Sequence, residues 1–349
     1  MRCLTLADEL SLRGAEILFV CREHPGNLNA VAVERGYTIV SLPYVSRGSS
    51  GAGQIPAHAS WLGAPWQEDA AETLTAVARF HPNWLVVDHY AIDHRWELLL
   101  RPHTGKLMVI DDLADRRHDC DLLLDQNLYL NMDSRYDGLL PDRCVRFLGP
   151  RYALLRREFV VARRNLRQRD GKVRRILVFF GGSDPTNETA KALEAVRRFG
   201  RPDILVDAVV GGGNPRRREI EDLCASMSAV RYHCQVSNMA ELTAAADLAI
   251  GAGGSATWER CFLGLPAIVL IIAQNQYEAT KAVSREGAVL ELGDAALVSV
   301  ELLAATISTA IQNSAHLKAM GEKALLLMGD DLINGRFPLV AAIEEGVGA

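Results

Sequence analysis

The residues best suited to chemistry lie in a glycine-rich stretch, 251–276, with the sequence GAGGSATWERCFLGLPAIVLIIAQNQ. Gly253 and Gly254 let the backbone turn sharply and come close to a ligand, because no Cβ stands in the way. Free N–H groups at the start of the following helix favour a phosphate. Glu259 comes one residue too late for a capping box with Ser255, so its carboxylate is available to ribose hydroxyls. The alternative is a loop–helix corner with a solvated glutamate.

The helix after this loop has recognisable ends. Ser255 or Thr257 can cap its start. Gly264 and Pro266 end it. The stretch therefore predicts a buried strand, a tight turn, a short helix and a second buried strand.

Two further loops of the second half could line the same site. The first, GGSDPTNET over 181–189, follows an apolar strand and can present backbone N–H groups to a diphosphate; Asn187 is expected to cap the next helix. The second is Gln274-Asn275-Gln276, which follows another apolar strand, so its amides can point toward the same ligand. The alternative for these amides is a polar loop held by its own hydrogen bonds.

In the first half, Asp88, His89 and Tyr90 directly follow the apolar run WLVV. Polar groups at a strand end are well placed for substrate contacts. The alternative is that Asp88 caps the next helix and Tyr90 packs. His24 lies in a turn, which is more typical of a structural histidine.

Strand-like and helix-like segments alternate along the chain, which predicts an α/β protein with parallel sheets. The expected strands are 15–21, 37–42, 84–88, 106–110, 122–125, 145–148, 175–180, 204–210, 230–233, 248–251, 267–272 and 288–292. Such a domain normally begins with a strand, whereas residues 2–13 have the spacing of an amphipathic helix. We therefore expect the N-terminal domain to lack its beginning.

The pattern predicts two doubly wound, Rossmann-like domains. An N-terminal domain is expected over 1–165 and a nucleotide-binding domain over 166–330, with a final helix in 331–349 that packs back on the first domain. Two such domains facing each other would place a ligand in a cleft at the carboxyl ends of their strands. Residues 43–65, rich in Gly, Ser, Ala and Pro, predict either a mobile loop near a site or a long surface connection.

A strongly basic segment, 151–175, lies where the two domains are expected to join. It could be a phosphate or nucleic-acid patch, but a solvated helix and linker is favoured, because the chain carries a net charge of −5. We expect no nucleic-acid partner.

The remaining composition excludes several classes of protein. Seven scattered cysteines without a CxxC motif favour a reduced, cytoplasmic protein. The histidines lack the spacing of a zinc site, so neither a metal nor a cofactor is expected. No apolar run approaches the ~20 residues of a membrane span, and the first residues do not form a signal peptide. Without a repeat or coiled coil, we expect a monomer.

Four motifs of the chain together resemble a known family. In order they are ADELSLRGAEILFVCREHPGN, VVDHYAID, ILVFFGGSDPTNET and GAGGSATWERCFLGLPAIVL…NQ. They are similar to the UDP-2,4-diacetamido-2,4,6-trideoxy-β-L-altropyranose hydrolases of pseudaminic acid biosynthesis, which serves bacterial surface glycans. The second half also resembles, more distantly, the UDP-N-acetylglucosamine transferase of peptidoglycan synthesis. Both have the glycosyltransferase-B fold.

The resemblance implies hydrolysis without a metal, in which water attacks the anomeric carbon with inversion and UDP leaves. It assigns substrate binding to Gly181, Gly182, Asp184, Gly253, Gly254, Ser255 and Glu259 of the second domain. Glu259 matches the glutamate that binds ribose. Asn275 matches an amide near the reacting centre and Tyr90 a cleft tyrosine, so these two are the expected catalytic residues.

The chain departs from the family at its start. In the family a strand and a G-x-G-H loop precede the segment matching Met1–Ala7, and the histidine of that loop is the expected general base. Either the true start lies upstream or the chain is a truncated form with little hydrolysis. Two other functions stay open, a UDP-sugar-dependent glycosyltransferase and an inactive UDP-sugar-binding remnant.

Overall fold

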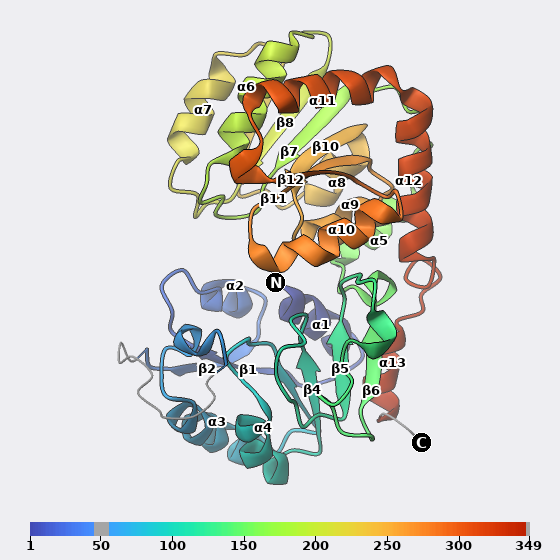
Figure 1. Ribbon diagram of the computed structural model, residues 1–349. Coiled ribbons are helices and arrows are strands. Elements are labelled where there is room, and N and C mark those ends of the chain that lie inside the picture. Colours follow the sequence, from blue (N-terminus) through green and yellow to red (C-terminus); the bar gives the residue numbers. More distant parts are fainter. Residues whose placement is uncertain (45–55, 347–349) are drawn as a thin grey trace. The chain divides into compact units, whose positions relative to one another are not determined.

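The computed structural model describes residues 1–44 and 56–346. The chain divides into two compact units, each an α/β body on parallel strands (Figure 1). Unit 1 comprises Met1–Asn127, Asn131–Leu154 and the chain from Phe337 onward; unit 2 comprises Leu128–Leu130 and Leu155–Arg336. The predicted α/β class with parallel sheets is confirmed. Of the predicted loop 43–65, residues 45–55 lie outside the described residues.

Unit 2 contains one continuous sheet of six parallel strands in the order β12-β11-β10-β7-β8-β9. Its strands are β7 (Arg175–Phe179), β8 (Leu205–Val210), β9 (Val230–Cys234), β10 (Leu248–Ala252), β11 (Ala267–Ile271) and β12 (Leu290–Asp294). Every residue of β10 and β11 is buried, because helices cover both faces of the sheet. The strand order reverses between β7 and β10, and such a switch point is where open α/β sheets bind ligands.

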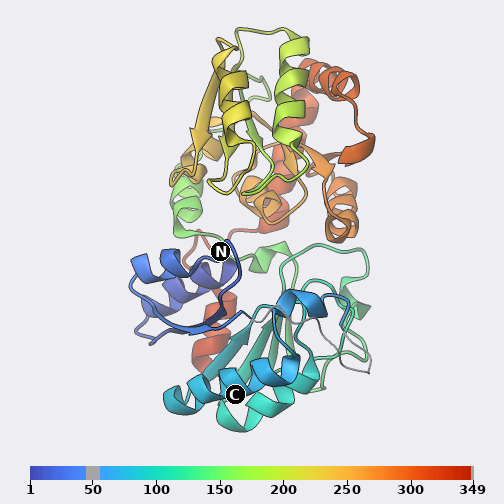
Figure 2. The same cartoon turned by 90° about the vertical axis from the view of Figure 1, so that its left-hand side faces the viewer.

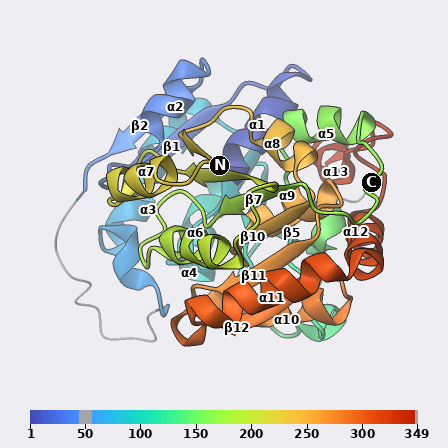
Figure 3. The ribbon, with the colours of Figure 1, turned by 90° about the horizontal axis from the view of Figure 1, so that it is seen from above.

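The helices of unit 2 follow the strands as crossover connections. They are α5 (Arg157–Arg164), α6 (Glu188–Phe199), α7 (Arg217–Ala225), α8 (Met239–Ala245), α9 (Ala256–Phe262), α10 (Tyr277–Arg285), α11 (Val300–Gln312) and α12 (Ser314–Met328). Helices α6 and α11 pack against each other, and α12 packs against α9 (Figures 1 and 3). The sequence predicts no element over 293–331, so α11 and α12 are additions to the predicted fold.

Unit 1 carries its parallel strands in two separate sheets. One pairs β1 (Leu18–Arg22) with β2 (Thr38–Leu42), and the other has the order β3-β4-β5-β6. The second sheet consists of β3 (Trp84–Val87), β4 (Lys106–Ile110), β5 (Leu122–Asp125) and β6 (Val145–Leu148). Within the described residues, β1 and β3 each pair with one neighbour only.

Helices of unit 1 cover the larger sheet on both faces (Figure 2). They are α1 (Arg2–Ser11), α3 (Trp66–Phe80), α4 (His94–Leu100) and α13 (Pro338–Glu345), whereas α2 (Asn29–Glu34) contacts β2 of the smaller sheet. The predicted N-terminal helix is confirmed. Leu6 of α1 shares a core cluster with Met108 of β4 and with Leu339 of α13. Helix α13 lies within the predicted 331–349 and begins at Pro338, since proline is tolerated in the first turn of a helix.

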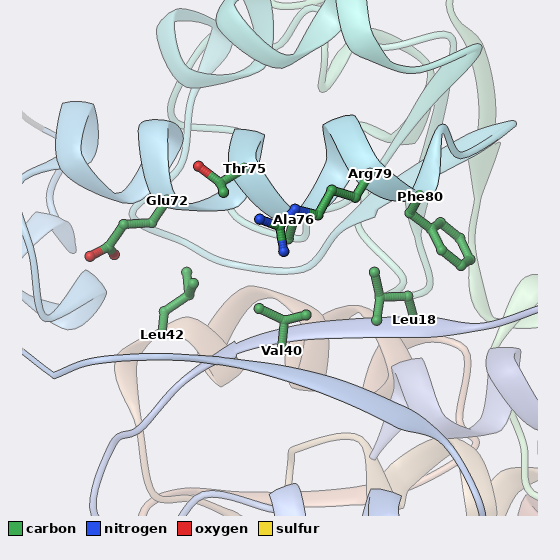
Figure 4. A pocket seen from close by; sticks show the side chains of 8 residues that line it. All are labelled: Leu18, Val40, Leu42, Glu72, Thr75, Ala76, Arg79 and Phe80. Atoms are coloured by element: carbon green, nitrogen blue, oxygen red, sulfur yellow. The ribbon is translucent and has the colours of Figure 1, made fainter.

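A hollow of about 440 Å³ lies between the two-stranded sheet and α3 (Figure 4). Its walls are mostly apolar and are formed by Leu18, Val40, Leu42, Glu72, Thr75, Ala76, Arg79 and Phe80. Protein interiors normally contain few voids larger than a water molecule. The hollow is open to solvent, so α3 and the small sheet leave more space between them than the layers of a packed interior do.

The basic segment of 151–175 contains the helix α5 and several exposed basic side chains, as the sequence favours, but two of its arginines bind the ends of other helices. Arg169 donates to the carbonyl oxygens of Thr243 (3.0 Å) and Ala246 (2.9 Å) at the end of α8. Arg163 donates to the carbonyl of Phe262 at the end of α9, and only 8% of its side chain is exposed. Burial lowers the pKa of Arg169 to about 10. These arginines satisfy carbonyl groups that helix ends leave unpaired.

Candidate functional site

The end of β10 and the glycine-rich loop after it pack closely against β7 and α10. A Cβ on Gly251 would lie 2.3 Å from the carbonyl oxygen of Phe179 in β7. A Cβ on Gly253 would lie 2.1 Å from Oγ1 of Thr280 in α10. Neither glycine has a positive φ. Glycine is therefore required here because there is no room for a side chain, and not because the backbone is left-handed.

The start of α9 carries no side-chain cap, so the predicted cap by Ser255 or Thr257 is wrong. Ser255 occupies the cap position with an exposed side chain. Thr257 is buried, and its Oγ1 accepts a hydrogen bond from Arg260 Nη2 at 3.0 Å. The predicted end at Gly264 is confirmed, with φ +56° directly after the last turn.

Glu259 does not form the solvated corner that was the alternative to ribose binding. Its side chain is 21% exposed, and Oε1 accepts a hydrogen bond from Arg156 Nη2 at 3.0 Å. Burial raises the pKa of Glu259, while the guanidinium of Arg156 acts in the opposite direction. The sequence treats Arg156 as one charge in a basic run, and only the fold shows its contact with this carboxylate.

Arg260 supports the start of the glycine-rich loop, and the sequence analysis did not identify it. It is almost fully buried, and its Nη2 donates to the carbonyl oxygen of Ala252 at 2.7 Å. Burial lowers its pKa. Because Ala252 ends β10 and leads into Gly253-Gly254, this contact fixes the end of the strand from which the loop starts.

The loop after β7 is held by its own aspartate. The buried carboxylate of Asp184 accepts hydrogen bonds from the N–H groups of Glu188 and Thr189, both at 2.9 Å. Asp184 therefore caps α6, and the predicted cap by Asn187 is wrong, since that side chain makes no capping hydrogen bond. Gly181 has φ +95°, which glycine adopts at no steric cost.

The neighbouring strand ends of unit 2 contact one another. A Cβ on Gly211, after β8, would lie 2.1 Å from the carbonyl oxygen of Gly182, after β7. The N–H of Gly212 donates to Oε1 of Gln235, after β9, at 2.8 Å. The carboxyl edge of this sheet thus presents closely packed backbone.

The Gln274–Gln276 segment forms the 3₁₀ turn η5, and one of its amides forms a hydrogen bond within its own loop, which was the alternative to ligand binding. Oε1 of Gln276 accepts a hydrogen bond from the N–H of Ile272 at 3.2 Å, so this side chain holds its own loop. Its Nε2 lies 3.5 Å from the position of a Cβ on Gly254. Asn275 is exposed. The structure thus brings η5 beside the glycine-rich loop.

In unit 1, the end of β3 carries a charged cluster. Asp88 forms an ion pair with Arg2 of α1, with Nη2 to Oδ1 at 2.6 Å. Burial would raise the pKa of Asp88, but Arg2 outweighs it and the pKa lies below its usual value. Tyr90 Oη donates to Asp112 Oδ1 at 2.5 Å, and burial raises the pKa of this phenol. Asp88 does not cap the next helix; Asp93 does, accepting from the N–H of Arg95.

A second group of acids in unit 1 escaped the sequence analysis. Asp111 directly follows β4 and Asp125 is the last residue of β5, and both are fully buried. Tyr136 Oη lies 3.0 Å from Asp125 Oδ2 and 2.9 Å from the carbonyl oxygen of Asp111. Burial raises the pKa of Asp125 to about 7. The available signal was an aspartate at the end of each apolar run, KLMVIDD and LLLD.

Neither histidine considered in the sequence is arranged as a general base. Nδ1 of His89 accepts the N–H of Ala91 at 3.0 Å, which places the proton of a neutral ring on Nε2. Burial lowers the pKa of His89. The ring of His24 stands edge-on to Tyr44, with centroids 5.1 Å apart. Both contacts are those of positioned, structural rings.

Two kinds of feature are absent from the residues that the structure describes. Over 1–44 and 56–346, no group of three or more His, Cys, Asp or Glu side chains is arranged to hold a metal ion. No helix in the same ranges combines the length and apolar character needed to cross a membrane.

Comparison with known proteins identifies the fold of the chain. Residues 176–334, most of unit 2, match the model of the glycosyltransferase family 28 C-terminal domain. MurG of Acinetobacter baumannii has a similar structure, with a TM-score of 0.66 at 13% identity, covering 99% of this chain and 95% of that one. The chain has the glycosyltransferase-B fold, which confirms the predicted fold class.

Three curated proteins are similar in sequence. An uncharacterized protein of Methanocaldococcus jannaschii is 27% identical over 60% of this chain and 44% of its own length. The spore coat polysaccharide biosynthesis protein SpsG of Bacillus subtilis is 33% identical over 44% and 46%. The UDP-2,4-diacetamido-2,4,6-trideoxy-beta-L-altropyranose hydrolase of Campylobacter jejuni is 26% identical over 58% and 71%. The chain spans less than half the length of the first two relatives.

Proposed function

We propose that unit 2 binds the UDP part of a nucleotide sugar at the carboxyl edge of its sheet. The observation that carries the proposal is the close packing at the ends of β8 and β10, where a Cβ on Gly211, Gly251 or Gly253 would collide with a neighbour. Side chains are excluded from these positions, so backbone N–H groups can approach a diphosphate. Glu259, one turn inside α9, is the residue we assign to the ribose hydroxyls.

Titration with UDP tests this assignment. Glu259→Gln keeps the shape of the side chain but removes the charge that strengthens hydrogen bonds from hydroxyls. We expect UDP to bind about tenfold or more weakly. Glu278→Gln, at an exposed glutamate of α10, is the matched control and should bind like the unchanged chain. Equal UDP affinity in both variants would contradict the role of Glu259.

We propose further that the reaction is hydrolysis of UDP-2,4-diacetamido-2,4,6-trideoxy-β-L-altropyranose. Water attacks the anomeric carbon, the bond from that carbon to the diphosphate oxygen breaks, and UDP leaves with the bonding electrons. Backbone N–H groups of the glycine-rich loops would stabilise the charge that develops on the diphosphate. Support comes from the four sequence motifs and from the Campylobacter relative. Asn275 and Tyr90 are assigned to the reacting sugar.

A sugar transferase is the second candidate, supported by the family 28 match of unit 2. The two functions differ in what limits UDP release. A hydrolase releases UDP from the nucleotide sugar in water alone, whereas a transferase releases it only when an acceptor is added. UDP release should be measured with this chain and with one extended upstream by the strand and G-x-G-H loop of the resembling family. Turnover by the extended chain alone supports hydrolysis with the upstream histidine as base.

A further inference from the structure

An exposed tryptophan in unit 1 has no role in the fold or in the proposed UDP site. Trp61 lies in the 3₁₀ turn η1 (Ala59–Leu62), and 55% of it is exposed. All five tryptophans of the chain fall in described residues, and the other four are buried or half-buried. An exposed large apolar side chain is informative when it belongs to a cluster, because single ones are common on surfaces.

Trp61 does belong to a cluster, which we call the aromatic cluster: His58, Trp61 and Tyr90. The ring centroids of His58 and Trp61 are 4.5 Å apart, and those of Trp61 and Tyr90 are 6.1 Å apart. His58 also lies 5.6 Å from Tyr90. Each ring therefore contacts both others, and Tyr90 is anchored by its hydrogen bond to Asp112. The indole of Trp61 is thus held in place by its neighbours while remaining open to solvent.

The surroundings of the aromatic cluster are polar and predominantly acidic. Asp88, two residues before Tyr90, and Asp112, bonded to Tyr90, lie at the carboxyl edge of the larger sheet. One guanidinium, that of Arg2, lies between these two carboxylates, 2.6 Å from Asp88 and 3.4 Å from Asp112. An aromatic face beside fixed polar groups is suited to a ligand with an apolar face and hydrogen-bonding edges.

A sugar ring has this combination, because its C–H groups form an apolar face and its hydroxyl and amide groups lie at the edge. A nucleobase could also stack on an indole, and the affinity for UDP, measured separately, distinguishes it from a sugar.

We propose that the aromatic cluster binds a monosaccharide by stacking its C–H face on Trp61. The choice of sugar rests on the proposed function. In a 2,4-diacetamido-2,4,6-trideoxy sugar, the C6 methyl and two acetamido methyl groups enlarge the apolar surface, and an aromatic cluster of three rings can cover more of it than one ring. Trp61 is thereby assigned a role in specificity for the sugar.

The test uses the full chain and two separate ligands, the free monosaccharide and UDP. Saturation-transfer NMR and tryptophan fluorescence report monosaccharide binding, and calorimetry reports UDP binding. We expect Trp61→Ala and Trp61→Leu to weaken monosaccharide binding about tenfold, since both remove the ring. Trp61→Phe should retain most of the affinity. Leu12→Ala, at a leucine 63% exposed at the far end of α1, is the control.

The outcomes separate this inference from the proposed function. UDP affinity unchanged in all variants, with monosaccharide binding lost only where the ring is lost, supports the aromatic cluster. Monosaccharide affinity unchanged in Trp61→Ala, or absent in the unaltered chain, overturns it even if UDP still binds. A loss of UDP affinity in Trp61→Ala would also overturn it, because the ring would then serve the nucleotide. Failure of the unaltered chain to bind UDP contradicts the proposed function instead.

Discussion

The two units are built from the same kind of element but differ in how completely their strands are covered. In unit 2, β10 and β11 have neighbours on both sides and every residue is buried. In unit 1, the apolar strands β1 and β3 have one neighbour each within the described chain, and only one residue of each is buried. The hollow on α3 adjoins the smaller sheet. One folding pattern thus yields strand ends packed backbone to backbone in one unit and, in the other, a small two-stranded sheet that is only partly covered.

The largest effect is expected where unit 2 is packed most closely. Gly251→Val would place its Cβ 2.3 Å from the carbonyl oxygen of Phe179, an atom of the neighbouring strand that cannot move independently. We expect unit 2 to lose about 3 kcal/mol or more of its free energy of unfolding. Denaturant unfolding followed by the fluorescence of Trp258, buried in α9, measures this.

A matched control for this substitution is Gly182→Ala. A Cβ there meets no atom within 4 Å, and the residue does not have a positive φ. Its free energy of unfolding should stay within about 0.5 kcal/mol of the unchanged chain. If Gly251→Val has the same free energy of unfolding as Gly182→Ala, close packing is not the reason for a glycine at position 251.

The buried carboxylates of the two units should respond to pH in different ways. Asp125 of unit 1 has its pKa raised to about 7 by burial. Asp207 of unit 2 has its pKa lowered, since Arg175 and His233 outweigh the effect of burial. A raised pKa means that the folded state holds the proton more tightly, so Asp125 stabilises unit 1 fully below about pH 4, and that contribution is lost as the pH rises toward 7. Asp207 is ionised throughout this window and contributes a constant amount.

Between pH 5 and 7 we therefore expect the free energy of unfolding of unit 1 to fall by up to about 1.4 kcal/mol per pH unit, relative to the variant Asp125→Asn. The amide of the variant retains an acceptor for the N–H of Asn127, which bonds Asp125 at 3.0 Å. Asp207→Asn should leave unchanged the slope with which the free energy of unfolding of unit 1 falls with pH. Parallel stability–pH curves for the unchanged chain and Asp125→Asn would show that Asp125 ionises normally.

The sequence predicted the strands well because they are continuous apolar runs with polar ends. The bounds of 106–110, 122–125 and 145–148 match β4, β5 and β6 residue for residue. Local sequence was less informative where side chains find distant partners. Arg260 looks like a surface charge in a helix, and only the fold buries it against the end of β10.

The candidate site likewise has features that the sequence reveals and contacts that only the fold shows. Glycine spacing and the position of Glu259 could be extracted from sequence alone, and their roles toward a ligand stay predictions. The contact between Arg156 and Glu259 joins residues 103 positions apart, and the aromatic cluster joins Tyr90 to η1 across 29 or more positions. No periodicity connects such residues, because their proximity results from the packing of whole elements.

The smallest effect is also the sharpest comparison, because the same substitution should act with opposite signs in the two units. Ala76 of α3 lines the hollow of unit 1, whereas Ala192 of α6 is fully buried in the core of unit 2. Leucine and alanine are both good helix formers, so the difference reports packing rather than propensity. Ala76→Leu should fill part of the hollow and stabilise unit 1 by about 1 kcal/mol. Ala192→Leu should destabilise unit 2 by roughly 1–3 kcal/mol through overpacking.

Thermal unfolding of both variants measures the sign of the stability change in each unit. If Ala76→Leu destabilises unit 1 as much as Ala192→Leu destabilises unit 2, the hollow cannot accommodate added carbon atoms and unit 1 is as closely packed as unit 2. If the expected signs are found, the space beside α3 accommodates added carbon atoms, and unit 1 is less closely packed there than the core of unit 2.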